Sequence, residues 1–137
     1  NALTAADGCI IPVRAEQYAI DGLDLLINTI NDVKKLLNEK LQVYGVIMTA
    51  YDSRNSLDKG LREALPSAGK AKGFRTFNNV IRISQDVKKA QAIQDEQDND
   101  GNIIPANRSL FENFGSSNAA IDYVNFTKEL LEVIKNG

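Results

Sequence analysis

The sequence predicts a three-layer α/β domain built on a doubly wound, mostly parallel sheet. Two apolar runs rich in β-branched residues, 9–13 and 43–49, are typical of strands that are covered on both faces. Between them, residues 15–38 carry apolar side chains every three or four positions, which indicates an amphipathic helix. Strand, long helix and strand form the βαβ unit of a parallel sheet, and the rest of the chain continues this alternation.

Several boundaries of these elements carry a local signal. Pro12 is expected to mark the end of the first strand, because proline cannot donate to a central ladder. Ser56 predicts the N-cap of a short helix, and Pro66 is expected to stop that helix before a Ser-Ala-Gly-Lys turn. A short third strand is expected over 74–77.

The second half of the chain is more polar. Ser84 predicts the cap of a helix that reaches Ile93. Residues 94–102 include no apolar side chain and predict an exposed loop. A final helix is expected over 118–134, where apolar residues share one face.

Composition limits the classes of function. The 137 residues, with 43% hydrophobic and 25% charged residues, predict one domain over 1–137. No apolar run is long enough to span a bilayer, and residues 1–7 lack the features of a secretory signal, so we expect a cytoplasmic location and no membrane contact. A net charge of -2 means that any contact with DNA must be local. Without histidine and with Cys9 alone, triad hydrolysis, ordinary zinc sites and internal disulfides are disfavoured.

Several sequence blocks resemble the second half of ParA/Soj-type chromosome or plasmid partition ATPases, in the same order and spacing. Only the segment from about Gln85 to Phe114 is poorly covered. The resemblance implies the second half of a P-loop NTPase fold. The blocks are NALTAAD, CIIPV, EQYAIDGLDLLINTI, YGVIMTAYDSRNS, VIRIS and SSNAAIDYVNFTKELLEVI.

The same resemblance implies a role in DNA segregation. Members of this family bind ATP and Mg, pair into a dimer that binds DNA without sequence preference on the nucleoid, and are stimulated by a ParB-type protein. No G-x-x-x-x-G-K-[ST] motif occurs in the chain, and the NALTAAD block normally follows the acidic Walker B strand. We therefore expect that the chain alone lacks Walker A and Walker B, binds no cofactor and does not hydrolyse ATP.

Two arginines match family positions that contribute to DNA binding. They are Arg54 in YDSRNS and Arg82 in VIRIS, both expected in loops or at helix starts, where a guanidinium reaches a phosphate. The alternative is a solvated surface arginine, or an ion pair such as Arg54 with Asp52. Three further cations would extend a basic patch, although such clusters are more often only solvated: Lys70, Lys72 and Arg75.

The resemblance also implies residues near the adenine base. Thr49 and Asp52 follow the second strand, and Pro12 belongs to the strand-end block that shapes the nucleotide pocket in the family. For Thr49 and Pro12 the alternative is an ordinary residue at a strand end. Asn78 and Asn79 occupy the place where many members have Pro-Arg beside the base, and this departure puts adenine recognition in doubt.

Two functions of different classes follow. The first is a DNA-segregation ATPase of which this chain supplies the base-side wall and the DNA-contacting surface. The second is a P-loop-less remnant or isolated domain that acts as a non-catalytic partner-binding or self-assembling module. A sheet edge and an apolar face near residues 1–13 would be bare without the first half of the fold, so we expect a homo-oligomer. The acidic segment 129–137 disfavours a membrane anchor.

Overall fold

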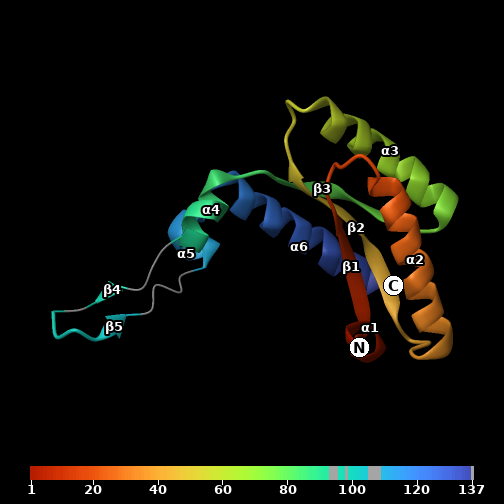
Figure 1. Ribbon diagram of the computed structural model, residues 1–137, viewed down its shortest axis with the longest axis horizontal. Helices are drawn as coiled ribbons and strands as arrows, with labels where there is room; N and C mark the ends of the chain where they lie inside the picture. Colours follow the sequence, from red (N-terminus) through yellow and green to blue (C-terminus); the bar gives the residue numbers. More distant parts are fainter. Residues whose placement is uncertain (93–95, 98, 105–108, 137) are drawn as a thin grey trace.

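The computed structural model describes residues 1–92, 96–97, 99–104 and 109–136. Figure 1 shows the helices and strands along the chain. In chain order they are α1 (Ala2–Ala5), β1 (Gly8–Val13), α2 (Ala19–Leu36), β2 (Gln42–Tyr51), α3 (Ser56–Lys72), β3 (Thr76–Arg82), α4 (Gln85–Ala92), β4 (Glu96–Gln97), β5 (Ile103–Ile104), α5 (Leu110–Phe114) and α6 (Asn118–Asn136).

The centre of the fold is a parallel sheet in the order β1-β2-β3. In Figure 1, α2 and α3 lie on one side of this sheet and α6 lies on the other. The predicted α/β class, with helices on both faces of a parallel sheet, is therefore confirmed. A separate antiparallel pair, β4 with β5, lies beyond α4 and α5.

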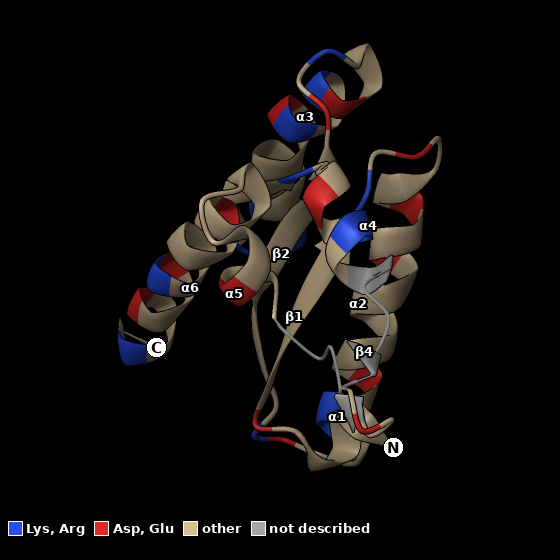
Figure 2. Cartoon of the chain, turned by 90° about the vertical axis from the view of Figure 1, so that its left-hand side faces the viewer, with Lys and Arg blue, Asp and Glu red and all other residues tan. Residues whose placement is uncertain are grey.

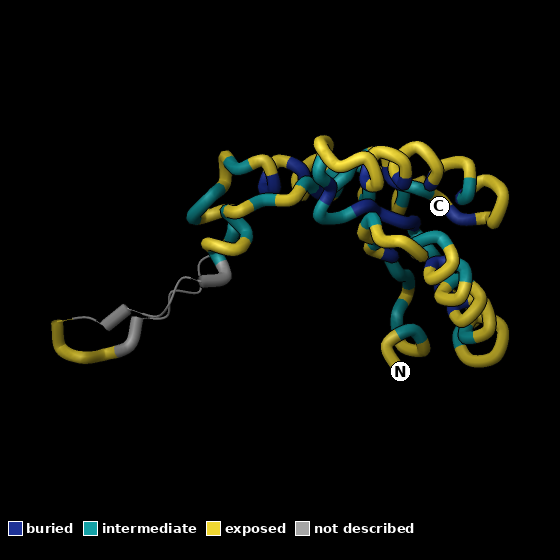
Figure 3. The backbone as a smooth tube through the Cα atoms, turned by 45° about the horizontal axis from the view of Figure 1, so that its top comes forward, coloured by how far each residue is buried: buried dark blue, intermediate teal, exposed yellow. Residues whose placement is uncertain are grey.

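Alternation along the strands divides the core into two parts. Ile11, Val46 and Met48 face α2 and α3, where they pack with Leu23 and Leu65. On the opposite face, a second set of apolar residues packs against α6. These residues are Ile10, Tyr44, Ile47, Phe77 and Ile81 of the strands and Phe126, Leu130 and Val133 of α6. Figure 3 shows the buried residues concentrated along the strands and on the inward sides of the helices.

Contacts of α6 with β3 fix the second face of the sheet. The rings of Phe77 and Phe126 meet edge to face, with centroids 4.9 Å apart. Val46 pairs with Thr76 and Met48 with Val80, so β3 carries extra residues between these two pairs. The extra residues form a bulge at 78–79, and its backbone is directed toward α6, as described below.

The predicted end of α3 at Pro66 is wrong. The helix begins after Asn55, whose side chain accepts the N–H of Leu57 at 2.9 Å, so Asn55 rather than Ser56 is the N-cap. It continues past Pro66 to Gly73, which adopts a left-handed conformation with φ 79°. Buried residues on both sides of the proline, among them Leu65, hold the helix together, and this packing outweighs the single hydrogen bond that proline cannot make.

Other boundaries also differ from expectation. The third strand covers Thr76–Arg82 instead of 74–77, because Phe74 packs into the core after the end of α3. Ser84 accepts the N–H of Asp86 at 3.2 Å and caps α4, as predicted, whereas Ile93 lies outside the described residues. The stretch predicted as an exposed loop contains β4, and 94, 95 and 98 lie outside the described residues.

The final helix is confirmed over its predicted length and extends to Asn136. Among the described residues, no helix combines the length and the apolar character required to cross a membrane.

Candidate functional site

The carboxyl ends of the three parallel strands meet at one edge of the sheet, which is where α/β proteins place their sites. Tyr51 at the end of β2 is in register with Arg82 at the end of β3, and the N–H of Ile83 donates to the carbonyl of Tyr51 at 2.9 Å. On the other side of β2, the hydroxyl of Thr49 donates to the carbonyl of Val13 at 3.3 Å. The predicted site residues at the strand ends are thus brought to a common edge.

The end of β2 has an irregular backbone. Ala50 has φ 53°, in the left-handed region, and the pairing of β2 with β3 shifts between Met48 and Tyr51. A non-glycine residue in this region costs on the order of 1 kcal/mol and is typical of functional loops. The ring of Tyr51 is buried beneath the guanidinium of Arg62, whose Cζ lies 5.2 Å from the ring centroid. The irregular backbone at Ala50 and the buried Tyr51 directly precede the loop that carries Asp52 and Arg54.

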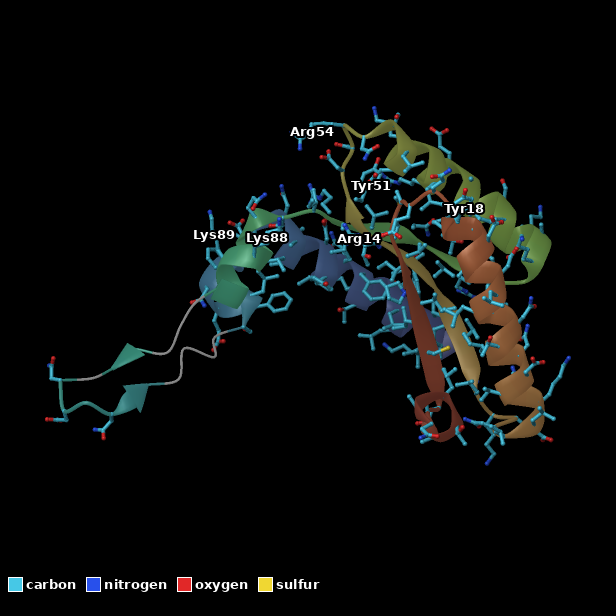
Figure 4. All side chains as sticks on the ribbon, viewed as in Figure 1. Arg14, Tyr18, Tyr51, Arg54, Lys88 and Lys89 are labelled. Atoms are coloured by element: carbon cyan, nitrogen blue, oxygen red, sulfur yellow. The ribbon has the colours of Figure 1, made fainter. Side chains whose placement is uncertain are left out.

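In that loop, Asp52 holds Arg54 by three hydrogen bonds. The backbone N–H and the Nε–H of Arg54 donate to Oδ1 of Asp52 at 2.9 and 3.0 Å, and Nη2 donates to Oδ2 at 2.8 Å. The N–H of Asp52 in turn donates to the buried carboxylate of Asp58 at 2.7 Å. The side chain of Arg54 is nevertheless 86% exposed, and Figure 4 shows it at the outer tip of the loop. The structure thus contains the ion pair that was the alternative interpretation of Arg54, in a fully accessible position.

The pair shifts the ionisation of both partners. Hydrogen bonds from the side chain and the backbone N–H of Arg54 lower the pKa of Asp52 to about 2. The same side-chain bond, with the charge of the carboxylate, raises the pKa of Arg54 above its already high value. Both groups are charged at neutral pH, and their charges cancel at the loop.

Arg82 forms the same kind of pair with Asp122 of α6. The backbone N–H and the Nε–H of Arg82 donate to Oδ2 of Asp122 at 2.9 and 2.8 Å, and Nη2 donates to Oδ1 at 2.7 Å. Here the carboxylate side chain is only 10% exposed, whereas the arginine side chain is 41% exposed. Arg82 is the last residue of β3. The expectation that it lies in a loop or at a helix start is therefore wrong, although α4 begins only three residues later, at Gln85.

Burial and hydrogen bonding act in opposite directions on Asp122. Burial raises the pKa of this carboxyl, but the hydrogen bonds from the Arg82 side chain and backbone N–H, together with the guanidinium charge, outweigh it, and the net direction is downward. The pKa of Arg82 is raised by its hydrogen bond to Asp122.

Asn78 and Asn79 are bound to α6. The two backbone N–H groups of the bulge donate to Oε1 and Oε2 of Glu129 at 2.7 and 3.0 Å, and both side-chain amides donate to the same carboxylate. Burial raises the pKa of Glu129, yet these hydrogen bonds bring it below its usual value. The family resemblance implies that Asn78 and Asn79 lie beside the adenine base. In the structure their side-chain amides instead donate to Glu129 of the same chain.

Pro12 lies in a different environment from the other predicted nucleotide residues. It is exposed and lines a hollow of ≈ 560 Å³ at the end of β1, together with Arg14 and Tyr18. Thr49, Asp52 and the asparagine pair do not line this hollow. Thr49 and Asp52 lie at or just after the end of β2 and the asparagine pair lies in the bulge of β3, so Pro12 alone of the five predicted nucleotide residues lines this hollow.

ATP phosphates with magnesium require a cradle of backbone N–H groups and oxygen ligands for the metal. No group of three or more histidine, cysteine or acidic side chains in the described part of the chain is arranged to hold a metal ion. The sequence has no P-loop to supply the backbone N–H cradle. Figure 2 shows acidic and basic residues interspersed along α3 and α6.

Sequence comparisons connect the chain to proteins of chromosome partitioning. A family model described as an AAA domain matches residues 1–43. The sporulation initiation inhibitor protein Soj of Bacillus subtilis is 41% identical over 86 residues, covering 62% of this chain and 34% of that protein. The chromosome-partitioning ATPase Soj of Thermus thermophilus is 36% identical over 92 residues, covering 67% and 35%. ParA of Myxococcus xanthus is 46% identical over 86 residues, covering 62% and 30%.

Solved structures agree on the fold. Cobyrinic acid a,c-diamide synthase from Mycobacterium smegmatis, with bound ATP analog and magnesium, matches 97% of this chain and 41% of its own, with a TM-score of 0.62 and 24% identity. The ADP and magnesium complex of that enzyme gives a TM-score of 0.61. These likenesses concern the fold alone. By its sequence, the chain belongs to the ParA/Soj-type family of partition ATPases, and it spans about a third of the length of the curated relatives it matches.

Proposed function

We propose that this chain is the DNA-contacting part of a DNA-segregation ATPase and that Arg54 and Arg82 bind the phosphate backbone of DNA. The observation that carries the proposal is the placement of both arginines at the carboxyl ends of neighbouring strands, where Tyr51 and Arg82 are in register. Both side chains remain accessible, at 86% and 41%. In the same proposal the protein is cytoplasmic, acts on the nucleoid and responds to a ParB-type partner, as the resemblance to the ParA/Soj family implies; one relative is named as a chromosome partitioning protein.

The hydrogen bonds within each pair leave room for a phosphate. Each arginine binds its carboxylate side-on, through Nε and Nη2. A guanidinium has five N–H donors in a fixed fork, so the edge formed by Nη1 and the second proton of Nη2 can still donate to an anion. Lys88 and Lys89 of α4 are exposed and lie on the same upper side of the molecule as Arg54 in Figure 4. Lys88 would add to the local cationic surface that a chain of net charge -2 otherwise lacks, whereas the ammonium of Lys89 lies 3.5 Å from Oδ1 of Asp86, which offsets part of its charge.

In this proposal, ATP is bound mainly by the P-loop half of the fold, which this sequence does not include. The phosphates and magnesium require a P-loop, and the residues described above offer at most a wall beside the base. The chain by itself is therefore expected to give no ATP turnover above a blank without protein. Turnover that is lost on substitution of a residue of this chain would contradict this expectation.

The test of DNA contact uses the chain joined to a P-loop half from a relative such as the Bacillus subtilis protein, with ATP, and a labelled duplex of arbitrary sequence. Arg54→Ala and Arg82→Ala should each weaken binding about equally for all DNA sequences, and each should reduce the salt slope by about 0.9. Lys35→Ala is the matched control, because Lys35 is exposed in the last turn of α2, at the opposite end of the sheet. The proposal is wrong if both arginine variants behave like this control.

A second candidate function, a self-assembling module without catalysis, is favoured by a specific surface. Leu25, Leu36 and Leu37 are exposed by 72%, 79% and 65% on or beside α2. Apolar side chains of this size in water favour burial against another surface. Light scattering of the isolated chain over a wide concentration range is expected to show oligomers, and a monomer throughout would exclude this function.

A further inference from the structure

Both arginine–carboxylate pairs use the same three donors, but their carboxylates differ in burial and origin. Asp52 is two residues from its arginine and is 28% exposed, whereas Asp122 is on α6, 40 residues further along the chain, and is 10% exposed. A buried carboxylate is kept charged only if its hydrogen bonds are complete. Asp122 therefore binds its guanidinium in one defined orientation.

We propose that Asp122 is a positioning residue for Arg82: it fixes the guanidinium so that the free Nη edge faces a DNA phosphate at the end of β3. This inference rests on the proposed function, since it requires Arg82 to contact DNA. One carboxylate receives both the backbone N–H and the side chain of Arg82, so it fixes the strand end and the guanidinium together. A bidentate, partly buried pair removes most of the rotamer freedom that an exposed arginine would lose on binding.

The sign of a charge-changing substitution separates positioning from plain electrostatics. Asp122 is an anion close to the surface that would bind an anionic polymer. If its role were only electrostatic, Asp122→Asn would remove a repulsive charge and strengthen DNA binding. A positioning role predicts the reverse, because an amide presents one acceptor and one donor where two acceptors are needed. Loss of affinity despite the gain of one positive unit is thus the diagnostic result.

Two charge-matched variants on the same helix serve as controls. Glu132→Gln changes the charge equally at an exposed position of α6. Glu129→Gln changes the charge equally and also removes hydrogen bonds that attach α6 to the bulge of β3. The first control measures the effect of charge, and the second measures the effect of a loosened helix.

The primary measurement is the Nε–H signal of Arg82 in nitrogen-15 NMR of this chain, titrated with duplex DNA at low ionic strength, where phosphate contacts are strongest. We expect DNA to shift the signals of Arg54 and Arg82 in the wild-type chain, and only that of Arg54 in Asp122→Asn. In the protein with a P-loop half and ATP, we expect Asp122→Asn to lower DNA affinity about fivefold, by the same amount as Arg82→Ala. Glu132→Gln should not lower the affinity. Asp122→Glu retains the charge but moves the carboxylate by one methylene, so it should recover part of the DNA affinity. This variant also serves as the test if Asp122→Asn does not fold.

The outcomes distinguish the two proposals. If Arg82→Ala lowers affinity but Asp122→Asn leaves it unchanged or raises it, Arg82 binds DNA and the positioning role is wrong. If Glu129→Gln lowers affinity as much as Asp122→Asn, docking of α6 explains the effect and the positioning role is again wrong. If neither arginine responds to DNA by NMR or by substitution, the proposed function itself fails, and the inference fails with it.

Discussion

The pair at the end of β2 and the pair at the end of β3 share a hydrogen-bond pattern but differ in what they connect. Asp52 and Arg54 belong to one loop, so the pair is also within reach in the unfolded chain. Arg82 and Asp122 come from a strand and a helix that meet only in the folded protein. The comparison teaches that identical side-chain geometry has different consequences: the first pair shapes a local loop, whereas the second attaches α6 to the sheet.

The largest expected effect on stability is that of Asp122→Ala. The substitution leaves the guanidinium and the backbone N–H of Arg82 without their shared acceptor in a partly buried place. Because Arg82 is itself 41% exposed, water compensates in part, and we expect a loss of about 2 to 3 kcal/mol in the free energy of unfolding. Chemical denaturation followed by circular dichroism measures it. An unchanged midpoint would show that this pair does not fasten α6.

Glu129→Gln should have the next largest effect. Glutamine keeps one of the two oxygens that accept the N–H groups of Asn78 and Asn79, and it loses the charge that strengthens these bonds. A loss of about 1 to 2 kcal/mol is expected by the same measurement. If the variant is as stable as the wild type, the bulge is held by the apolar contact of Phe77 with Phe126 instead.

Acid should weaken the attachment of α6 by a smaller, graded amount. The pKa values of Asp122 and Glu129 are lowered in the folded state from their ordinary values of 3.8 and 4.5. Their stabilising contribution is therefore present above these ordinary values and is lost as the pH falls through the lowered folded-state pKa values. Thermal midpoints measured from pH 5 downward should decrease, and a variant with both Asp122→Asn and Glu129→Gln should lose that part of the pH dependence. Equal pH dependence in both proteins would contradict the assignment.

Asp52→Asn should have the smallest effect. Although Arg54 lowers the pKa of Asp52 to about 2, the pair is exposed, local and screened by salt. The thermal midpoint is expected to stay within experimental error of the wild type. A decrease as large as that of Glu129→Gln would show that the β2 pair is structural after all and would remove the contrast between the two sites.

The sequence predicted those features that depend on local pattern. The buried runs of β1 and β2, the amphipathic α2 and the apolar face of α6 all follow from the spacing of apolar residues, and all are present. The capping box of α5, in which Ser109 and Glu112 bond each other's backbone N–H groups, also has a local signal in the sequence, the pattern S-x-x-E.

The remaining features depend on contacts that are distant in sequence. Helix α3 continues past Pro66 because Leu61 and Leu65 are buried. The rule that a proline ends a helix considers only the local backbone and does not include this packing. The partner of Arg82 lies on another element, and no spacing rule identifies Asp122. For Arg54 the neighbour Asp52 was named as a partner because that pair is local. The assignment of Asn78 and Asn79 to a nucleotide stays a prediction, to which Glu129 is a competitor.

The carboxylates of α6 also determine in which direction the sheet can grow. An unpaired row of strand N–H groups invites another strand, which is how edges cause aggregation. On β3, the N–H groups of Asn78, Asn79 and Arg82 are already bonded to α6, and an incoming strand would bring its carbonyls near two negative charges. In the described part of the chain, β1 pairs only with β2. We therefore expect a further strand to join this sheet beside β1 rather than beside β3.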